Sequence, residues 1–442
     1  MSIVLHMLVT AAALLGVLWL ISKWRFFQIE HINRRWLSGL FLLKVVAGLC
    51  VWAVYTYYYP YRNTSDAFRY YDDAMVILSS LPADPKVFFN FMLGINADAP
   101  EMQAYYEQMR GWTSAYNYGI AHDNPTVIRL NVIIGLFSRG YYHVHTVAFA
   151  AMSMIGTVAA YKAISRWIRP PGHLPSLVLL LTMPSLLFWT DGVLKEAPLI
   201  MGLGLLLLAW FRLLFEGYTH WRLALLILTL SLLIFIKGYV LVAIIPALIG
   251  SLLWKWAGVK WGGWVFLGAH IALFLLALHA HYVFIGGDFL YVLQKKQTDF
   301  YNVAELQSAG STIEIPRVDN VGDFLLHAPG AVYRTYFRPD FRDVQGPFHV
   351  LAFLEGVFCL VLVALSAGIR QMQNRPPLML SLSIASAIIT FGVIVGSVVP
   401  VLGALTRYKV PGLLLLVMLC CIWIDWSKLV RLSPGIARAL KM

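Results

Sequence analysis

The chain has 442 residues, of which 60% are hydrophobic and only 13% are charged, whereas soluble domains carry roughly 25% charged residues. This composition excludes a soluble globular protein and indicates an integral membrane protein. The formal net charge of +12 does not indicate nucleic-acid binding, because basic residues that border apolar spans are the usual sign of cytoplasmic membrane anchoring.

Apolar runs predict about eleven membrane-spanning helices, so the expected fold class is all-α. Several runs reach the roughly 20 residues needed to cross about 30 Å of hydrocarbon. The runs are centred near residues 2–22, 36–59, 141–164, 174–190, 196–215, 222–236, 239–254, 262–284, 347–367, 378–398 and 408–425. The sixth and seventh runs are short, which predicts a tight hairpin around Lys237.

The first run, residues 1–22, has no basic residue before its apolar core, and Lys23 and Arg25 follow it. This order is the reverse of a cleavable secretory signal, so we expect a retained helix with its N-terminus outside. The count of spans then places the C-terminus and the basic connecting segments in the cytoplasm, as the positive-inside rule requires. Of the 22 acidic residues, only four are expected away from the outer side: Glu30, Glu216, Asp425 and, within a span, Glu355.

Two outer segments, residues 60–140 and 285–346, are too long to be simple turns. They contain too many aromatic and aliphatic residues for disorder, so we expect them to fold on the outer face of the membrane. Within the first segment, PKVFFNFMLGI and NPTVIRLNVIIGLFSRG are apolar but too short to span, which favours helices lying in the interface.

The stretch SDAFRYYDDAMVIL, residues 65–78, follows the second run and carries three carboxylates. In a helix Asp66, Arg69, Tyr70 and Asp73 would share one face, at positions i, i+3, i+4 and i+7, while Asp72 would point elsewhere.

Two interpretations of this stretch stay open. In the structural one, a residue among Asn63, Thr64 and Ser65 caps the helix, Asp66 complements the helix dipole and Arg69 neutralises the remaining charge. In the functional one, a carboxylate at the outer membrane boundary acts as general base on an acceptor hydroxyl, a role worth about 10²–10⁴ in rate.

The stretch PSLLFWTDGVLKEAP, residues 184–198, interrupts two apolar runs with Asp191, Lys195 and Glu196. Ionisable groups at this depth are costly and are usually paired or functional. A plain Asp191–Lys195 pair at i, i+4 is the structural alternative. For Lys237 the alternative is a side chain that reaches the interface, and for Lys44 we expect only that role, on the cytoplasmic side.

A third motif, HAPGAVYRTYFRPDFRD, residues 327–343, spaces Arg334, Arg338 and Arg342 by four until Pro339 disturbs the helix. Arginine suits bidentate binding of phosphate, so this outer cluster could hold a lipid phosphate at headgroup level. The alternative is a solvated basic face that contacts anionic lipid.

The stretch GALTRYKVPG adds Arg407 and Lys409 at the outer start of the last span, where interface anchoring is the competing role. Glu355 is expected to face the interior of the helix bundle.

Other motifs are absent or weak. The i, i+2 spacing of His143 and His145 does not place two metal ligands on one helix face. The four cysteines lie in predicted spans without a CxxC pair, which predicts neither a disulfide framework nor a zinc site. The sequence also lacks a GxSxG elbow, a Walker loop and a GxGxxG turn after a strand.

The order of these pieces resembles the GT-C glycosyltransferase fold. An apolar helix is followed by an outer loop with an early acidic motif, SDAFRYYDD, and amphipathic segments. The later elements PSLLFWTDGVLKEAP, HAPGAVYRTYFRP and GALTRYKVP resemble those of bacterial GT-C proteins of cell-envelope polysaccharide and protein glycosylation. The resemblance covers residues 36–442, and residues 1–35 then form an additional first helix with its basic cytoplasmic loop.

The resemblance implies a multi-pass enzyme of the bacterial plasma membrane. Such an enzyme transfers a sugar from a polyprenyl-phosphate carrier to an extracytoplasmic glycan, lipid or protein, usually with inversion. Asp66 matches the catalytic aspartate of the early loop, with Asp72 or Asp73 as helper or substitute. We expect no cofactor. Some members of the family use a divalent metal and others do not, and this chain offers only the adjacent Asp72–Asp73 in place of a DxD pair.

The basic positions that the resemblance assigns to the donor phosphate are Lys195, Lys237, Arg334, Arg338 and Arg407. The supporting positions are Arg69, Tyr70, Asp191 and Glu196.

Three alternatives remain. A polysaccharide polymerase or ligase would use a glycan linked to polyprenyl pyrophosphate. A transporter or flippase would carry broken helices and ionisable groups near the bilayer midplane, often with repeated halves. A noncatalytic scaffold of an envelope-assembly complex would need none of the outer carboxylates.

Overall fold

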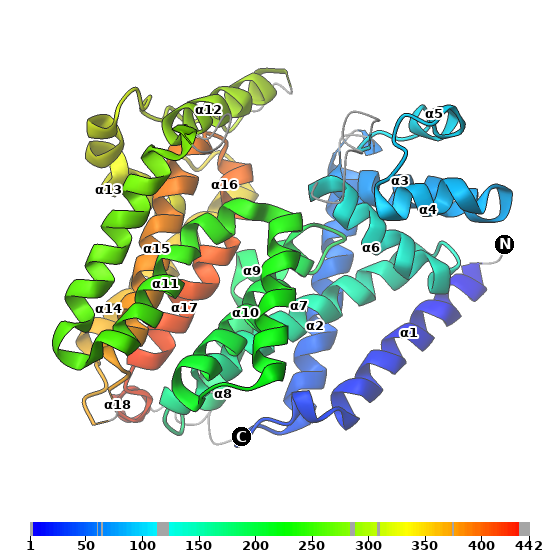
Figure 1. Ribbon diagram of the computed structural model, residues 1–442. Coiled ribbons are helices and arrows are strands. Elements are labelled where there is room, and N and C mark those ends of the chain that lie inside the picture. Colours follow the sequence, from blue (N-terminus) through cyan, green and yellow to red (C-terminus); the bar gives the residue numbers. More distant parts are fainter. Residues whose placement is uncertain are drawn as a thin grey trace. The chain divides into compact units, whose positions relative to one another are not determined.

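A computed structural model describes residues 3–59, 61–62, 65–112, 123–282, 288–306, 310–373 and 375–432 (Figure 1). Every regular element within these residues is a helix, so the prediction of an all-α fold is confirmed. Seven of the described helices are long and apolar enough to cross a membrane, or eight when a bent pair is counted as one span. These helices define a helical membrane protein, although the expected number of eleven spans is not confirmed.

The helices follow one another along the chain in the order that Figure 1 labels. Their bounds are α1 Ile3–Lys23, α2 Arg34–Ala53, α3 Asp66–Ala83, α4 Pro85–Leu93, α5 Pro100–Tyr106, α6 Asp123–Ser138, α7 Tyr142–Ile164, α8 His173–Thr182, α9 Pro184–Trp189, α10 Glu196–Glu216, α11 His220–Leu278, α12 Phe289–Leu306, α13 Val321–Phe337, α14 Pro347–Gly368, α15 Leu378–Val398, α16 Leu402–Tyr408, α17 Val410–Trp423 and α18 Trp426–Leu432.

The chain divides into two compact units. Unit 1 comprises residues 1–163, 186–209 and 219–238, and unit 2 comprises residues 164–185, 210–218 and 239–442. The predicted separation of residues 1–35 from the rest stays a prediction. Each unit is described below by itself.

Unit 1 is built on close crossings of its apolar helices. A Cβ atom at Gly156 of α7 would collide with the carbonyl oxygen of Ile200 in α10, and a Cβ at Gly204 of α10 would collide with the carbonyl oxygen of Gly156. The backbones of α7 and α10 therefore touch, and only glycine allows this approach.

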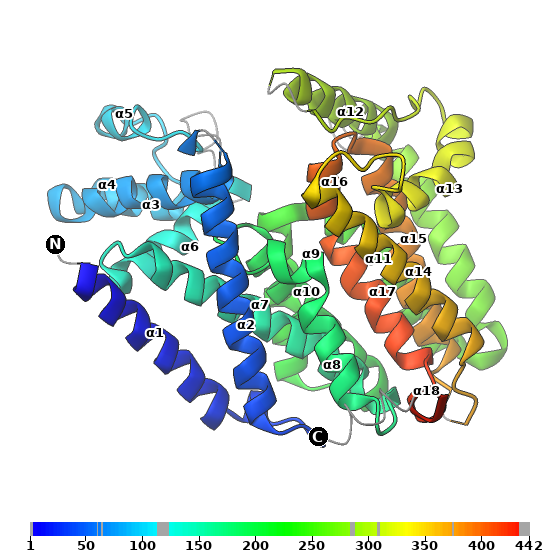
Figure 2. The same cartoon turned by 180° about the vertical axis from the view of Figure 1, so that it is seen from behind.

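The chain between α2 and α7 in unit 1 forms the helices α3 to α6, here called the α3–α6 layer, which lie together at one end of α2 in both views (Figures 1 and 2). The sequence explains their bounds. Ser65 is the N-cap residue of α3, although its side chain donates and accepts no capping bond. Asp84 caps α4 by accepting a 2.9 Å hydrogen bond from the backbone N–H of Lys86, and Gly94 ends that helix in the left-handed conformation.

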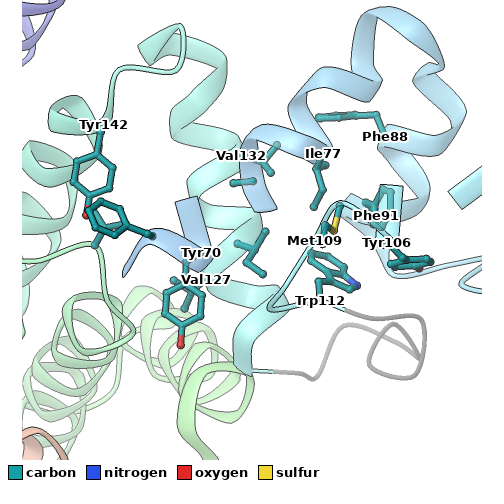
Figure 3. Close-up of a cluster of buried hydrophobic side chains, with 14 of the residues drawn as sticks. Tyr70, Ile77, Phe88, Phe91, Tyr106, Met109, Trp112, Val127, Val132 and Tyr142 are labelled. Atoms are coloured by element: carbon teal, nitrogen blue, oxygen red, sulfur yellow. The ribbon is translucent and has the colours of Figure 1, made fainter. Parts of the chain in front are cut away.

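Aromatic side chains form the core of the α3–α6 layer (Figure 3). Phe91 of α4 lies edge-on to Tyr106 and to Trp112, with ring centroids 5.2 and 5.5 Å apart. The predicted helices within residues 65–78, PKVFFNFMLGI and NPTVIRLNVIIGLFSRG correspond to α3, α4 and α6, so these three predictions of helix are confirmed. Asn63 and Thr64 lie outside the described residues.

Helix α11 is 59 residues long, about 88 Å if straight, and thus far longer than one crossing requires. It reverses near Gly258, which has a φ angle of +73°. The rings of Trp254 and Phe266 lie 5.8 Å apart, whereas a straight helix would separate these residues by about 18 Å. This reversal agrees with separate predicted spans at 239–254 and 262–284.

One prediction about helix ends is open and one is wrong. Lys237 lies within the residues of α11, and the tight hairpin around it stays a prediction. The predicted span at 174–190 is two helices of ten and six residues, α8 and α9, and each is too short to cross a bilayer. The break comes at Met183, directly before Pro184, where the chain leaves the helical conformation.

In unit 2, α13 packs along α15. The hydroxyl of Tyr336 donates a 2.8 Å hydrogen bond to the carbonyl oxygen of Ile388, and a Cβ at Gly396 would collide with the carbonyl oxygen of Ala331. The last predicted span is a bent pair, because α16 and α17 meet at an angle of 54° next to Lys409.

Candidate functional site

A fixed turn in unit 1, residues 190–195, connects α9 to α10 and carries part of the predicted site. Asp191 is fully buried, and its carboxylate lies 3.0 Å from the ammonium of Lys44 in the middle of α2. The hydroxyl groups of Thr190 and Ser153 lie 2.5 Å apart. Both partners of each contact are buried, where polar interactions are stronger than in water. These contacts therefore hold the turn against α2 and α7.

Glycine allows α2 to approach the turn. A Cβ at Gly48 would collide with the carbonyl oxygen of Asp191, and a Cβ at Gly192 would lie 2.6 Å from Val51. The expected role of Lys44 at the cytoplasmic interface is therefore wrong, because its side chain turns to the buried Asp191 and not to water. The alternative Asp191–Lys195 pair is not formed either.

Lys195, at the end of this turn, reaches the α3–α6 layer instead. Its ammonium contacts the carboxylate of Asp123, the first residue of α6. It also lies 5.5 Å from the ring centroid of Tyr70 in α3, a cation–π distance. The hydroxyl of Tyr70 lies 3.2 Å from the side-chain oxygen of Asn124. Helices α3, α6 and α10 thus meet around one lysine.

The next residue, Glu196, begins α10 and is fully buried. Its carboxylate lies 2.8 Å from the ammonium of Lys237 in α11. The side chain of Lys237 is itself buried, so it does not reach the interface as the structural alternative required. Lys195 and Glu196, which are consecutive in the chain, therefore belong to two different ion pairs, Asp123–Lys195 and Glu196–Lys237.

The first turn of α3 packs against the turn at residues 190–195. Ala67, adjacent to Asp66, is fully buried in one cluster with Val51 of α2 and Leu194 of the turn. Asp66 is partly buried at the first position of α3, and Tyr70, which contacts Lys195, follows it by one turn of the same helix. The structure therefore brings the acidic motif and the turn motif together within unit 1.

The two other aspartates of α3 have defined partners. Asp72 makes a two-bond ion pair with Arg62, with distances of 2.7 and 3.1 Å. Asp73 is buried and accepts backbone hydrogen bonds from Arg110 and Gly111, at 3.0 and 2.7 Å. Burial raises the pKa of Asp73, while these two backbone bonds act in the opposite direction. Asp73 thereby anchors the segment that leads to Trp112.

The predicted arginines lie in unit 2. Arg334 of α13 is half-buried and donates a 3.0 Å bond from Nε to the carbonyl oxygen of Gly396. Arg338, directly after α13, pairs with Asp343 in the turn that follows. Arg342 pairs with Asp340 and holds the pKa of that carboxyl well below its usual range. The spacing by four therefore does not produce one helical face of arginines, because α13 ends before Arg338.

Glu355 faces the interior of unit 2, as predicted, and connects two helix breaks. It lies 2.8 Å from the ammonium of Lys409, between α16 and α17, and both side chains are fully buried. It also accepts hydrogen bonds of 2.6 and 2.5 Å from the backbone N–H and the hydroxyl of Ser185 in α9. Arg407 lies two residues before Lys409, in α16, with its Nε buried.

One buried network has the bond pattern of a nucleophilic triad. Nε2 of His145 lies 2.9 Å from the hydroxyl of Ser138, and its Nδ1 lies 2.8 Å from the side-chain oxygen of Asn131. All three residues have no exposed surface. No substrate can reach this serine in the described structure, so the network joins α6 to α7 and gives His145 a structural role.

Two members of the site were missed from the sequence, Asp123 and Lys44. A lysine in the middle of a span was the available signal for Lys44, whereas nothing local marks Asp123. Among the described residues no group of three or more histidine, cysteine, aspartate or glutamate side chains could hold a metal ion. All four cysteines are free thiols, and Cys50 is the one exposed on the surface of its helix.

The fold and the buried ion pairs define the class of protein, a helical membrane protein with paired charges at its helix breaks. Comparison of the chain with protein-family models, with curated proteins and with solved structures found no match.

Proposed function

We propose that this protein is a membrane glycosyltransferase that transfers a sugar from a polyprenyl-phosphate-linked donor to an extracytoplasmic glycan, lipid or protein. The observation that carries the proposal is the packing of the first turn of α3 against the turn at residues 190–195, through Ala67 and Leu194. This packing brings a carboxylate helix and a lysine turn together in one unit, as base-assisted transfer with a phosphate leaving group requires.

In this proposal Asp66 is the general base that activates the acceptor hydroxyl. It is preferred over its neighbours because it is the first residue of α3 and adjoins Ala67, which packs with Leu194 of the turn at residues 190–195. Lys195 stabilises the negative charge that develops on the leaving phosphate, whereas Lys237 stays paired with the buried Glu196. Arg334, Arg338 and Arg407 lie in unit 2, and their predicted role in binding the donor phosphate stays a prediction from the sequence.

The proposal is tested by substituting Asp66→Asn in the full chain, reconstituted in liposomes with a panel of polyprenyl-phosphate hexoses and pentoses. We expect the rate of sugar transfer to fall by about 10²–10⁴, because the amide cannot accept the proton. Glu101→Gln is the matched control, since it removes an exposed carboxylate from α5 of the same α3–α6 layer. Full transfer activity in Asp66→Asn, at normal expression, would remove Asp66 from the mechanism.

A transporter or flippase of lipid-linked glycans is the second candidate, and the helix breaks favour it. Buried charges lie where α9 gives way to α10 and where α16 bends into α17, and many secondary transporters bind substrate and coupling ions at such discontinuous helices. Ion-coupled movement of a lipid-linked glycan across proteoliposomes, without any covalent product, would select this candidate over the transferase.

A further inference from the structure

The three lysine–carboxylate pairs of unit 1 differ in their access to water. In Lys44–Asp191 the two side chains are 1% and 0% exposed, and in Lys237–Glu196 they are 7% and 0% exposed. In Lys195–Asp123 the lysine is only 10% exposed, but the aspartate is 56% exposed. The third pair alone therefore has one partner in water and one partner in the protein.

This difference in exposure determines which ion pair can separate. Separating a buried pair leaves an uncompensated charge in the protein, which is strongly unfavourable. Asp123 can instead turn into water, because its side chain is largely exposed. An incoming anion could therefore replace Asp123 on Lys195 at low cost, whereas the two buried pairs stay closed.

Lys195 would keep its place during such an exchange. It follows directly on the turn that Asp191, Thr190 and Gly192 fix against its neighbours, and the ring of Tyr70 lies 5.5 Å from its ammonium. Asp123 has a separate anchor, because it accepts a 2.8 Å hydrogen bond from the backbone N–H of Asn124. Neither residue thus depends on the other for its position.

We infer that Asp123 is the resting counter-ion of Lys195, and that the phosphate group of the bound ligand displaces it. Asp123 is then a positioning residue: it orients the ammonium of Lys195 when no phosphate is bound, and it competes with the phosphate for the same lysine. The inference rests on the proposed function, because the phosphate it names is that of the polyprenyl carrier.

The inference predicts that the loss of an acidic residue strengthens ligand binding. Purified full-length Asp123→Asn protein should bind sugar-free polyprenyl phosphate about two- to fivefold more tightly than the wild type, the factor that corresponds to an exposed ion pair. Binding is measured by native mass spectrometry with added lipid. Asp123→Glu, which restores the competing charge, should return the affinity to the wild-type value. Lys195→Met should lose the binding and should also abolish the effect of Asp123→Asn in the double variant.

Glu101→Gln is again the control for the loss of one outer carboxylate, and it should leave the affinity unchanged. Unchanged or weaker binding by Asp123→Asn would overturn the exchange, while leaving the proposed function in place. If neither the wild type nor any variant bound polyprenyl phosphate, the proposed function and this inference would both fail. A gain of affinity for phosphatidylglycerol alone would retain the exchange and overturn the polyprenyl donor.

Discussion

At the scale of single residues, the Lys44–Asp191 pair makes a prediction about stability. Asp191→Asn leaves the Lys44 ammonium buried without its counter-charge, so we expect a loss of about 3–5 kcal/mol in the free energy of unfolding. The double variant Lys44→Met/Asp191→Asn should recover most of this loss, because no unpaired charge remains. Thermal unfolding of the purified protein in detergent measures both effects.

The control for this prediction is Asp72→Asn, which breaks a pair whose side chains are 55% and 46% exposed. A solvated pair of this kind should contribute less than about 1 kcal/mol. Equal destabilisation by Asp191→Asn and Asp72→Asn would mean that Lys44 and Asp191 do not form a buried pair in the membrane.

Residue roles were the hardest part to predict from the sequence. The sequence shows that Lys44 and Lys237 lie in apolar surroundings, and reaching for the interface is the cheapest local solution for one lysine. Their partners, Asp191 and Glu196, lie 147 and 41 positions away in the sequence, and no local pattern predicts such pairing. For the same reason Asp123 could not be assigned to Lys195, from which it is 72 positions distant.

At the scale of helices, the crossing of α7 and α10 predicts that Gly204 cannot be enlarged. Gly204→Ala should destabilise the protein by about 1–3 kcal/mol, because the added methyl group would overlap the carbonyl oxygen of Gly156. Gly16→Ala in α1 is the matched control, since a Cβ there meets nothing within 4 Å. That variant should be neutral or slightly stabilising, because alanine favours a helix.

The melting temperatures of the two glycine variants in one detergent decide the comparison. A Gly204→Ala protein as stable as Gly16→Ala would show that the two backbones do not touch.

Helices were predicted well where the pattern is local. The acidic stretch at residues 65–78 and the two short apolar runs of the outer segment became α3, α4 and α6, because caps, proline and apolar spacing lie within each segment. Hydropathy alone failed where a span is broken. It gives the same signal for a continuous helix as for α8 and α9, whose separation follows from one proline and from the buried carboxylate of Glu355 bound to Ser185.

At the scale of the whole molecule, the charge distribution predicts the orientation in the membrane. Residues 60–140 and 285–346 should lie outside, and the basic connections should lie in the cytoplasm. In a variant without the four native cysteines, a single cysteine at Glu107→Cys should react with a membrane-impermeant maleimide in intact cells. Arg375→Cys should react only after permeabilisation. The reverse result would invert the orientation and would place the proposed site on the cytoplasmic side.

The buried pair between α2 and the turn at residues 190–195 also has a consequence for biosynthesis. During translation α2 enters the membrane when Asp191, 147 positions later, has not yet been made. A lysine at the centre of an inserting helix costs about 2.5–3.5 kcal/mol on the translocon scale. The Lys44–Asp191 pair can therefore form only after α9 and the turn have been synthesised. Completion of this part of the fold is thus a late event in biosynthesis.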